Sequence, residues 1–230
     1  MHPFAAEWFA DAVVHTTGLF TGLIACLVLV FLAVRRARAT PVPSVKSALL
    51  LALGLYGLGL AAMLICSALY NLYVDHPLHG LLRRIDHAAI FLMIAGTVTP
   101  FALLCVRGRR GLKMFAAIWV LAGAGIVLKF IVPAEFEYLS IPAYLLLGWA
   151  VALAYRPLRE TMPGAGLALL AAGCMIYTLG VAAYLWTDLS YQLAIWHSFV
   201  LVGAACHFTC IVGYATGPTV LGRCCNTGAR

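Results

Sequence analysis

Charged residues are scarce in this chain: they make up 10% of its 230 residues, whereas hydrophobic residues make up 64%. A soluble domain carries about 25% charged and roughly 45–50% apolar residues, so the composition excludes a soluble protein. The sequence also lacks a basic leader before its first apolar run, and that run is too long for the hydrophobic region of a signal peptide. We therefore expect the first run to remain in the mature protein as a helix.

Disulfide and zinc-knuckle spacings are missing as well. The eight cysteines lie mostly inside apolar runs, where a free thiol behaves as a small hydrophobe. The net charge of +7 would suit a nucleic acid, but the basic residues lie in short loops between apolar runs, which is typical of membrane orientation. The sequence therefore predicts membrane lipids as partners and excludes nucleic acid.

Seven apolar runs divide the chain, at about residues 12–34, 47–71, 87–106, 112–132, 138–155, 165–187 and 192–217. A helix needs about 20 apolar residues to cross the hydrocarbon core, and runs of this length do not have the alternating pattern of a barrel. Proline and glycine separate the runs, for example at Pro133 and at Pro163-Gly164. The sequence predicts one all-α domain over residues 1–230, a polytopic seven-transmembrane-helix bundle.

The loop charges predict how the bundle sits in the membrane. Short loops at one end, after the second, fourth and sixth runs, hold only two basic residues, Arg83 and Arg84. The other loops and the tail hold Arg35, Arg36, Arg38, Lys46, Arg107, Arg109, Arg110, Lys113, Arg156, Arg159, Arg223 and Arg230. The positive-inside rule then places the N-terminus outside and the C-terminus in the cytoplasm.

Four polar side chains are expected to meet near one membrane face. Ser67 and Asn71 are four residues apart, on one face of the second helix. Asp86 opens the third helix, and His197 lies in the first turns of the seventh. An ionisable residue at membrane depth marks a functional site by default. A purely structural role for Asp86 also stays open, because Arg83 can pair with it along the helix and carboxylates favour helix N-termini.

The sequence around these residues resembles a known family. Residues 67–70 read Ser-Ala-Leu-Tyr, residues 84–91 read Arg-Ile-Asp-His-Ala-Ala-Ile-Phe, residues 94–101 read Ile-Ala-Gly-Thr-Val-Thr-Pro-Phe, and residues 194–200 read Ala-Ile-Trp-His-Ser-Phe-Val. These motifs resemble the hemolysin III branch of the progestin and adipoQ receptor (PAQR) superfamily, and the resemblance covers nearly the whole chain.

The resemblance implies a zinc ion near one membrane face, held by three histidines. It gives His197 a ligand role, Ser67 a supporting role and Asp86 the role of a base or water-positioner. The other two family ligand positions carry Asn71 and Leu193 here. Because one imidazole holds zinc weakly, we predict a degenerate zinc site.

Other histidines could replace the missing ligands, or zinc could be absent altogether. His76 and His79 lie in the loop after Asn71 and could fold over His197. His207 lies about 15 Å further along the helix than His197, since each residue rises 1.5 Å, so we predict a hydrogen-bonded core histidine. We expect Lys129 to snorkel to the membrane interface.

Two functions of different class follow from these residues. The favoured one is a non-catalytic membrane protein that binds lipid in its cavity, as a lipid-binding or membrane-homeostasis sensor. The alternative is a zinc-dependent, ceramidase-like hydrolase of lipid amides or esters. The receptor members of the superfamily place the metal level on the cytoplasmic side, opposite to the orientation that the loop charges predict. The Gly18-x-x-x-Gly22 motif suits either a homo-oligomer seam or packing within the bundle.

Overall fold

The prediction of a seven-helix bundle is confirmed. The computed structural model describes residues 3–133 and 138–227. Within this part of the chain, seven helical segments are long and apolar enough to cross a membrane, and no residue is in a β-strand. Because the bilayer core cannot hydrogen-bond backbone groups, continuous helices are the form such runs must take.

The described elements follow one another with short connections. In chain order they are α1 (Pro3–Ala39), α2 (Pro43–Leu72), α3 (His79–Pro100), the π-helix η1 (Phe101–Val106), α4 (Gly108–Ile131), α5 (Ser140–Trp149), the 3₁₀-helix η3 (Ala150–Ala154), α6 (Tyr155–Thr161), α7 (Gly164–Leu185), α8 (Gln192–Cys210), the π-helix η4 (Ile211–Ala215) and α9 (Pro218–Thr227).

Helix boundaries differ most from the predicted spans at the starts of α1 and α3, which begin at Pro3 and His79, so Asp86 lies inside α3 and does not open it as predicted. The end of α1 and the fifth span differ as well. Helix α1 continues beyond the apolar run through Arg35 to Ala39, because arginine and alanine are good helix formers. Proline then separates the first two helices, and Pro43 begins α2 in the first-turn position that proline tolerates. The fifth span is not one α-helix, since η3 joins α5 to α6.

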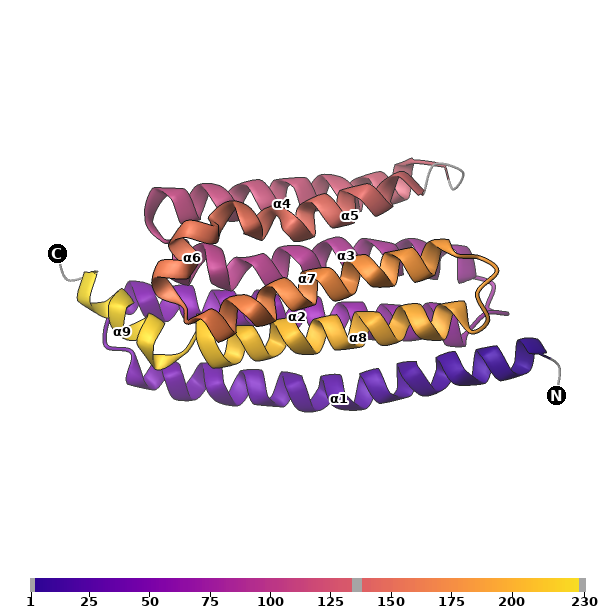
Figure 1. Cartoon of the computed structure of the whole chain (residues 1–230), viewed down its shortest axis with the longest axis horizontal. Coiled ribbons are helices and arrows are strands. Elements are labelled where there is room, and N and C mark those ends of the chain that lie inside the picture. The colour runs from indigo at the N-terminus through magenta and orange to yellow at the C-terminus, as the bar shows by residue number, and fades with distance from the viewer. Residues whose placement is uncertain (1–2, 134–137, 228–230) are drawn as a thin grey trace.

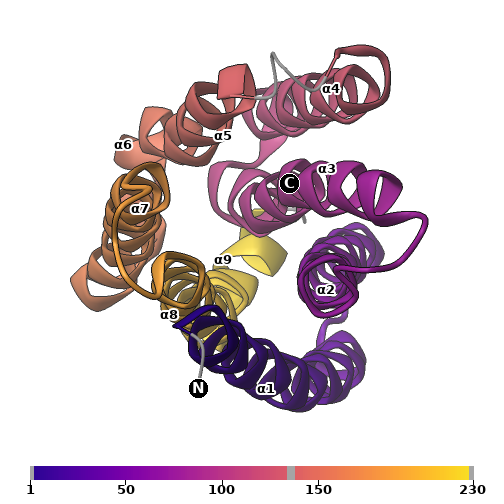
Figure 2. The same cartoon turned by 90° about the vertical axis from the view of Figure 1, so that its right-hand side faces the viewer.

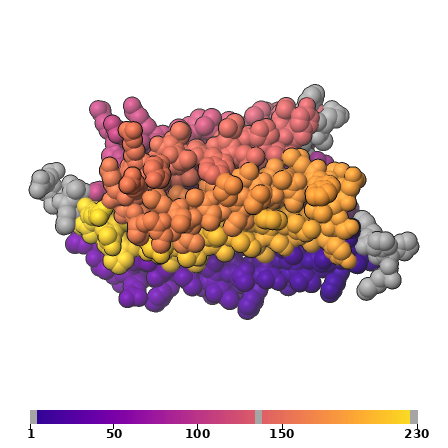
Figure 3. Space-filling model, in the orientation of Figure 1, coloured from indigo at the N-terminus to yellow at the C-terminus, as the bar shows by residue number. Residues whose placement is uncertain are grey.

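The spans form a closed ring. Consecutive helices contact one another from α1 to α4, α5 contacts α4 and α7, and α8 contacts both α7 and α1 (Figure 2). Figure 3 shows α7 and α8 covering one face of the molecule, with α1 along one edge. The two termini lie at opposite ends of the long axis (Figure 1), as an odd number of spans requires. The ring brings α1 and α8, the first and last spans, side by side.

Helices α2 and α3 cross very closely, and two glycines make this possible. A Cβ atom on Gly96 would lie 2.7 Å from the Leu55 carbonyl oxygen, and one on Gly59 would lie 3.0 Å from that of Leu92. Small residues at a membrane helix crossing let the backbones approach each other. The close crossing brings the end of α2, with Ser67, next to the start of α3, with Asp86.

The Gly18-x-x-x-Gly22 motif packs inside the bundle. A Cβ atom on Gly22 would meet Leu64 Cδ1 at 2.2 Å, and one on Gly18 would meet Leu201 Cδ2 at 3.0 Å. Leu64 belongs to α2 and Leu201 to α8, so both glycines face neighbouring helices of the same chain. Of the two interpretations of this motif, the structure supports packing within the bundle.

The short helix α9 closes the end of the ring that is opposite the N-terminus (Figure 2). Its Val220, Leu221 and Cys224 side chains are buried. Arg107, which precedes α4, donates a 3.0 Å hydrogen bond to the Cys224 carbonyl oxygen. Arg36 of α1 donates to Thr216 Oγ1 and to the Val212 carbonyl oxygen, at 2.5 and 2.8 Å. Hydrogen bonds from arginine side chains therefore link the helices at this end of the bundle.

Candidate metal centre

Asp11 and His15 form the first half of a buried polar cluster. They are four residues apart on α1 and therefore share one face of that helix. Both are buried, at 5% and 7% exposure. A carboxylate at membrane depth is costly unless it is paired, so the partners of Asp11 define the site.

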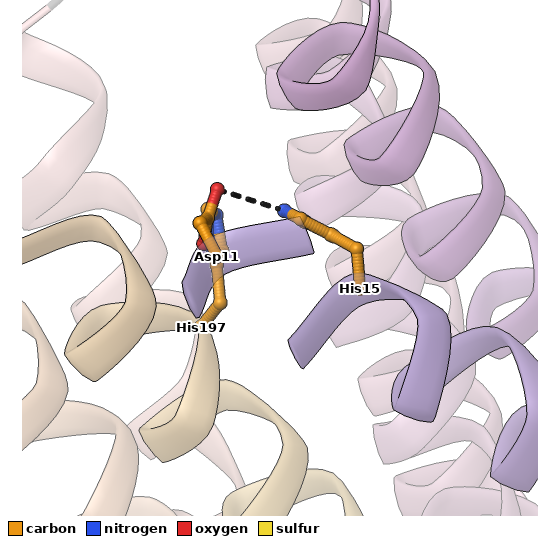
Figure 4. A group of neighbouring side chains, drawn as sticks. All are labelled: Asp11, His15 and His197. Carbon is orange, nitrogen blue, oxygen red and sulfur yellow. Dashed lines mark hydrogen bonds and ion pairs between the residues drawn. The ribbon is translucent and has the colours of Figure 1, made fainter. Parts of the chain in front are cut away.

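His197 of α8 completes the cluster. Its Nδ1–H donates a 2.6 Å hydrogen bond to Asp11 Oδ1, and His15 Nε2 lies 3.4 Å from Asp11 Oδ2. The two imidazole rings are 4.4 Å apart, centre to centre. Figure 4 shows both imidazoles directed at the Asp11 carboxylate, one from α1 and one from α8. The ring closure between the first and last spans therefore creates this site.

A small cavity adjoins the two histidines. It has a volume of about 30 Å³, and its walls include His15, Ser67 and His197. A cavity of this size has room for one small molecule such as water. We call this space the polar chamber. His15 Nε2 is buried beside the chamber and makes no hydrogen bond of good geometry, although it lies 3.4 Å from Asp11 Oδ2.

Asp86 of α3 is connected to the polar chamber through Ser67, which lines it. Its carboxylate is 7% exposed, makes a side-chain hydrogen bond with Ser67, and interacts electrostatically with His15 and Lys129. The structure thus brings Ser67, Asp86 and His197 to one level of the bundle. Their catalytic or ligand roles stay predictions.

The remaining family ligand positions do not supply metal ligands. The Asn71 amide donates to the Ser67 carbonyl oxygen at 2.9 Å and to Ser67 Oγ at 3.4 Å, so it serves to hold α2 and its serine. Leu193 has no ligand atom, and 42% of it is exposed. The loss of the family's zinc ligands at these two positions stays a prediction.

Neither loop histidine replaces the missing ligands, so that hypothesis is wrong. The His79 ring stacks on Tyr70 at 4.7 Å, and His76 Nδ1 accepts a hydrogen bond from the Leu78 backbone N–H. His207 is a core histidine as predicted, since it is buried and its Nε2 lies 3.2 Å from the Leu170 carbonyl oxygen.

Lys129 does not snorkel, and this prediction is also wrong. The side chain is only 4% exposed, and its ammonium lies over the Tyr144 ring at 5.8 Å from the ring centre. Helices α3 and α5 both contact α4. Packing of α4 against these helices buries the Lys129 side chain inside the bundle.

Comparison with known proteins agrees with this architecture. The family model described as "Haemolysin-III related" matches residues 7–208. The chain belongs to the haemolysin III-related family. It is 35% identical to "Hemolysin-3" of Bacillus cereus over 93% of this chain and 94% of that protein. It is 33% identical to the "Hemolysin-3 homolog" of Bacillus subtilis (strain 168) over 90% and 94%.

A human relative places this haemolysin III-related chain close to the PAQR group. The chain is 30% identical to the human "Monocyte to macrophage differentiation factor" over 70% of this chain and 68% of that protein. Together with seven apolar helices, these relatives show an integral, multi-pass membrane protein of the kind that the motifs predicted.

Asp11, His15 and His197 fit a zinc ion. Each offers one ligand atom, and the three atoms lie within 4.8 Å of one another. Ligand atoms around tetrahedral zinc lie about 3.3 Å apart when its bonds are 2.0–2.1 Å long, and the His15–Asp11 distance of 3.4 Å matches this value. The shorter Asp11–His197 contact is a hydrogen bond, which metal binding would replace. Two imidazoles and one carboxylate are a common zinc ligand set.

Sequence reasoning did not identify Asp11, and it gave His15 no ligand role. A signal was present, because an acid and a histidine four residues apart inside an apolar run lie on one helix face. Their proximity to His197, 186 positions from Asp11, depends on ring closure and has no local signal.

Proposed function

We propose that this haemolysin III-related protein binds a membrane lipid in its internal cavity and is not an enzyme. An apolar cavity of about 100 Å³ carries the proposal. Helices α3, α5, α7 and α8 supply most of its walls, which include Met93, Phe101, Tyr144, Trp149, Leu170 and Trp196. Small-molecule sites in proteins are concave and mostly apolar, with few polar groups, and this cavity shares that character.

The apolar cavity and the polar chamber are neighbours. Met63 of α2 lines both of them, and Trp196 in the first precedes His197 in the second. Methionine side chains are flexible and adapt to irregular space. The arrangement suits an amphiphile that places its long apolar part in the larger space and a small polar group near the smaller one.

We also propose that Zn²⁺ binds to Asp11, His15 and His197. The donor set and the buried His15 nitrogen, which makes no hydrogen bond of good geometry, support zinc over the harder cations, which prefer oxygen ligands. A zinc ion there would supply Lewis-acid chemistry. In the lipid-binding function it would instead fix the spacing of α1 and α8 beside the cavity.

Loop charge supports an orientation with the N-terminus outside and the metal level near the outer face. Most basic loop residues lie at the end of the bundle that carries α9, whereas Asp11 lies in the first turns of α1, which begins at the opposite end (Figure 1). Anionic inner-leaflet lipids and the insertion machinery both favour this arrangement.

A second function is a zinc-dependent lipid amide or ester hydrolase. The observation in its favour is that Ser67 and two histidines line a chamber large enough for one water molecule, and that Asp86 makes a side-chain hydrogen bond with Ser67. In that role Asp86 would hold or take a proton, and Ser67 would orient the reacting group.

Filling the cavity tests lipid binding. A Cβ atom on Gly148, which lines the apolar cavity, would meet no atom within 4 Å, and the same holds for Gly123 of α4, which does not line it. We expect Gly148→Leu to reduce the quenching of tryptophan fluorescence by brominated stearic acid at least tenfold, and Gly123→Leu to leave it unchanged. Equal quenching in both variants would refute the cavity as the lipid site.

A turnover assay separates the two functions. Purified protein loaded with zinc is incubated with a ceramide, and released fatty acid is measured against a His197→Ala control. The lipid-binding function predicts equal, background release from both proteins. Release that requires His197 would instead establish the hydrolase.

A further inference from the structure

Lys129 is an unusual residue for a membrane-spanning helix. It lies in the last turns of α4, is 4% exposed, and its ammonium faces the Tyr144 ring of α5. A buried ammonium is costly in hydrocarbon, and such residues pair with an opposite charge or mark a functional site. The cation–π contact with Tyr144 compensates only part of the lost hydration, so an acidic partner is expected.

The Asp86 carboxylate lies at the same level of the bundle, because Tyr144, which contacts Lys129, also donates a 2.8 Å hydrogen bond to the carbonyl oxygen of the adjacent residue His87. Asp86 interacts electrostatically with Lys129 on one side and with His15 on the other. Helices α3 and α4, which carry Asp86 and Lys129, are linked to each other. Arg84 of α3 donates hydrogen bonds to the Lys129 and Val132 carbonyl oxygens, at 2.5 and 3.3 Å. One turn before Lys129, Gly125 packs against the Phe91 ring, where an added Cβ would lie only 2.5 Å away.

These contacts extend a line of polar side chains across the bundle. The line runs from His197 on α8 through Asp11 and His15 on α1, then through Ser67 on α2 and Asp86 on α3. Lys129 on α4 continues it. Among the described residues, this line holds two carboxylates, Asp11 and Asp86, and the Lys129 ammonium.

We propose that Lys129 is the buried counter-charge of Asp86, and that this pair sets how strongly the Asp11–His15–His197 cluster attracts a divalent cation. The inference rests on the proposed zinc site. A fixed positive charge in a low-dielectric interior opposes a cation at the cluster, and a fixed carboxylate favours it. Lys129 is thus a positioning and tuning residue that does not touch the metal.

Zinc affinity of the full-length, detergent-purified protein tests the charge effect by chelator competition. Lys129→Met keeps the length of the side chain and removes its charge, and we expect it to tighten zinc binding about tenfold. Lys129→Arg, which keeps the charge, should stay close to the wild type. Lys113→Met, at the exposed end of the same helix, changes the net charge equally and should have no effect.

A double-mutant cycle tests the pairing itself. Asp86→Asn should weaken zinc binding about tenfold, and the double variant with Lys129→Met should return to within about threefold of the wild type. A Lys129→Met variant whose zinc affinity falls or stays unchanged would overturn the proposal, because a merely structural lysine cannot tighten a metal site when it is removed.

Thermal unfolding separates this inference from the zinc proposal. Each single variant leaves one buried charge without its partner, so each should lower the Tm of the metal-free protein by several degrees. The Tm of the double variant should fall by much less than the sum of the two single losses. If the wild type binds no zinc, the proposed zinc site is refuted, and the Tm values alone then test the Lys129–Asp86 pair. Losses of Tm that are smaller in the double variant than the sum of the two single losses support the pair, and additive losses refute it.

Discussion

Replacing Asp11 with asparagine tests the metal centre at the residue that joins its two histidines. The substitution keeps the size of the side chain and removes its charge. In the structure Asp11 accepts the 2.6 Å hydrogen bond from His197 and lies 3.4 Å from His15. An asparagine offers one oxygen where the carboxylate offers two, so its amide nitrogen must face one of the imidazoles.

The expected losses follow from these contacts. Outer-shell changes already cost about 10–100-fold in metal affinity, so loss of the anionic ligand should weaken zinc binding by at least about 100-fold. Without metal, one unsatisfied buried polar group costs about 1–3 kcal/mol. For a chain of this length each kcal/mol lowers the Tm by about 2–4 °C.

Zinc content by elemental analysis and thermal unfolding in detergent measure both effects. Asp188→Asn is the matched control, because it removes the same charge from the exposed α7–α8 loop at the same end of the bundle. Equal zinc content in the two variants would refute the reasoning. So would a protein that loses its zinc on replacement of Asn71 but not of Asp11.

Two further predictions concern the fold and the orientation. Gly96→Ala should lower the Tm by several degrees, because the new Cβ would lie 2.7 Å from the Leu55 carbonyl oxygen and overpacking costs about 1–3 kcal/mol. Gly123→Ala is the control: its Cβ would meet no atom within 4 Å, so the Tm should stay unchanged or rise. A membrane-impermeant maleimide should label the half-buried Cys225 only from the cytoplasmic side, with Cys225→Ser as control. Cys224 should react slowly at neutral pH because burial raises the pKa of its thiol. Labelling of Cys225 from outside intact cells would refute the predicted orientation and place the C-terminus outside.

The seven spans could be predicted because they depend on local physics. A run of about 20 apolar residues has one stable form in a bilayer, whatever its neighbours are. The helix ends were less accurate, since α1 continues through Arg35 to Ala39 and the fifth span divides at Ala150. Basic residues and short 3₁₀ turns do not interrupt a helical segment in the way that a hydropathy pattern suggests.

The candidate site was predicted in part. Ser67 and Asp86 were expected to meet His197, because their helices begin or end at one membrane face, and the structure places them at one level. Asp11 and His15 were missed as ligand candidates because contact between the first and last spans is a tertiary property. Lys129 was misplaced for a similar reason, since only packing decides whether a long cationic side chain reaches water or another helix.

The most direct test of the metal centre is X-ray absorption spectroscopy at the zinc edge of the wild-type protein. The structure predicts one zinc per chain with two imidazoles and one carboxylate oxygen in its first shell, and loss of one imidazole signal in each of His15→Ala and His197→Ala. Stoichiometric zinc whose first shell is unchanged in His15→Ala and Asp11→Asn, or no bound zinc at all, would contradict the account.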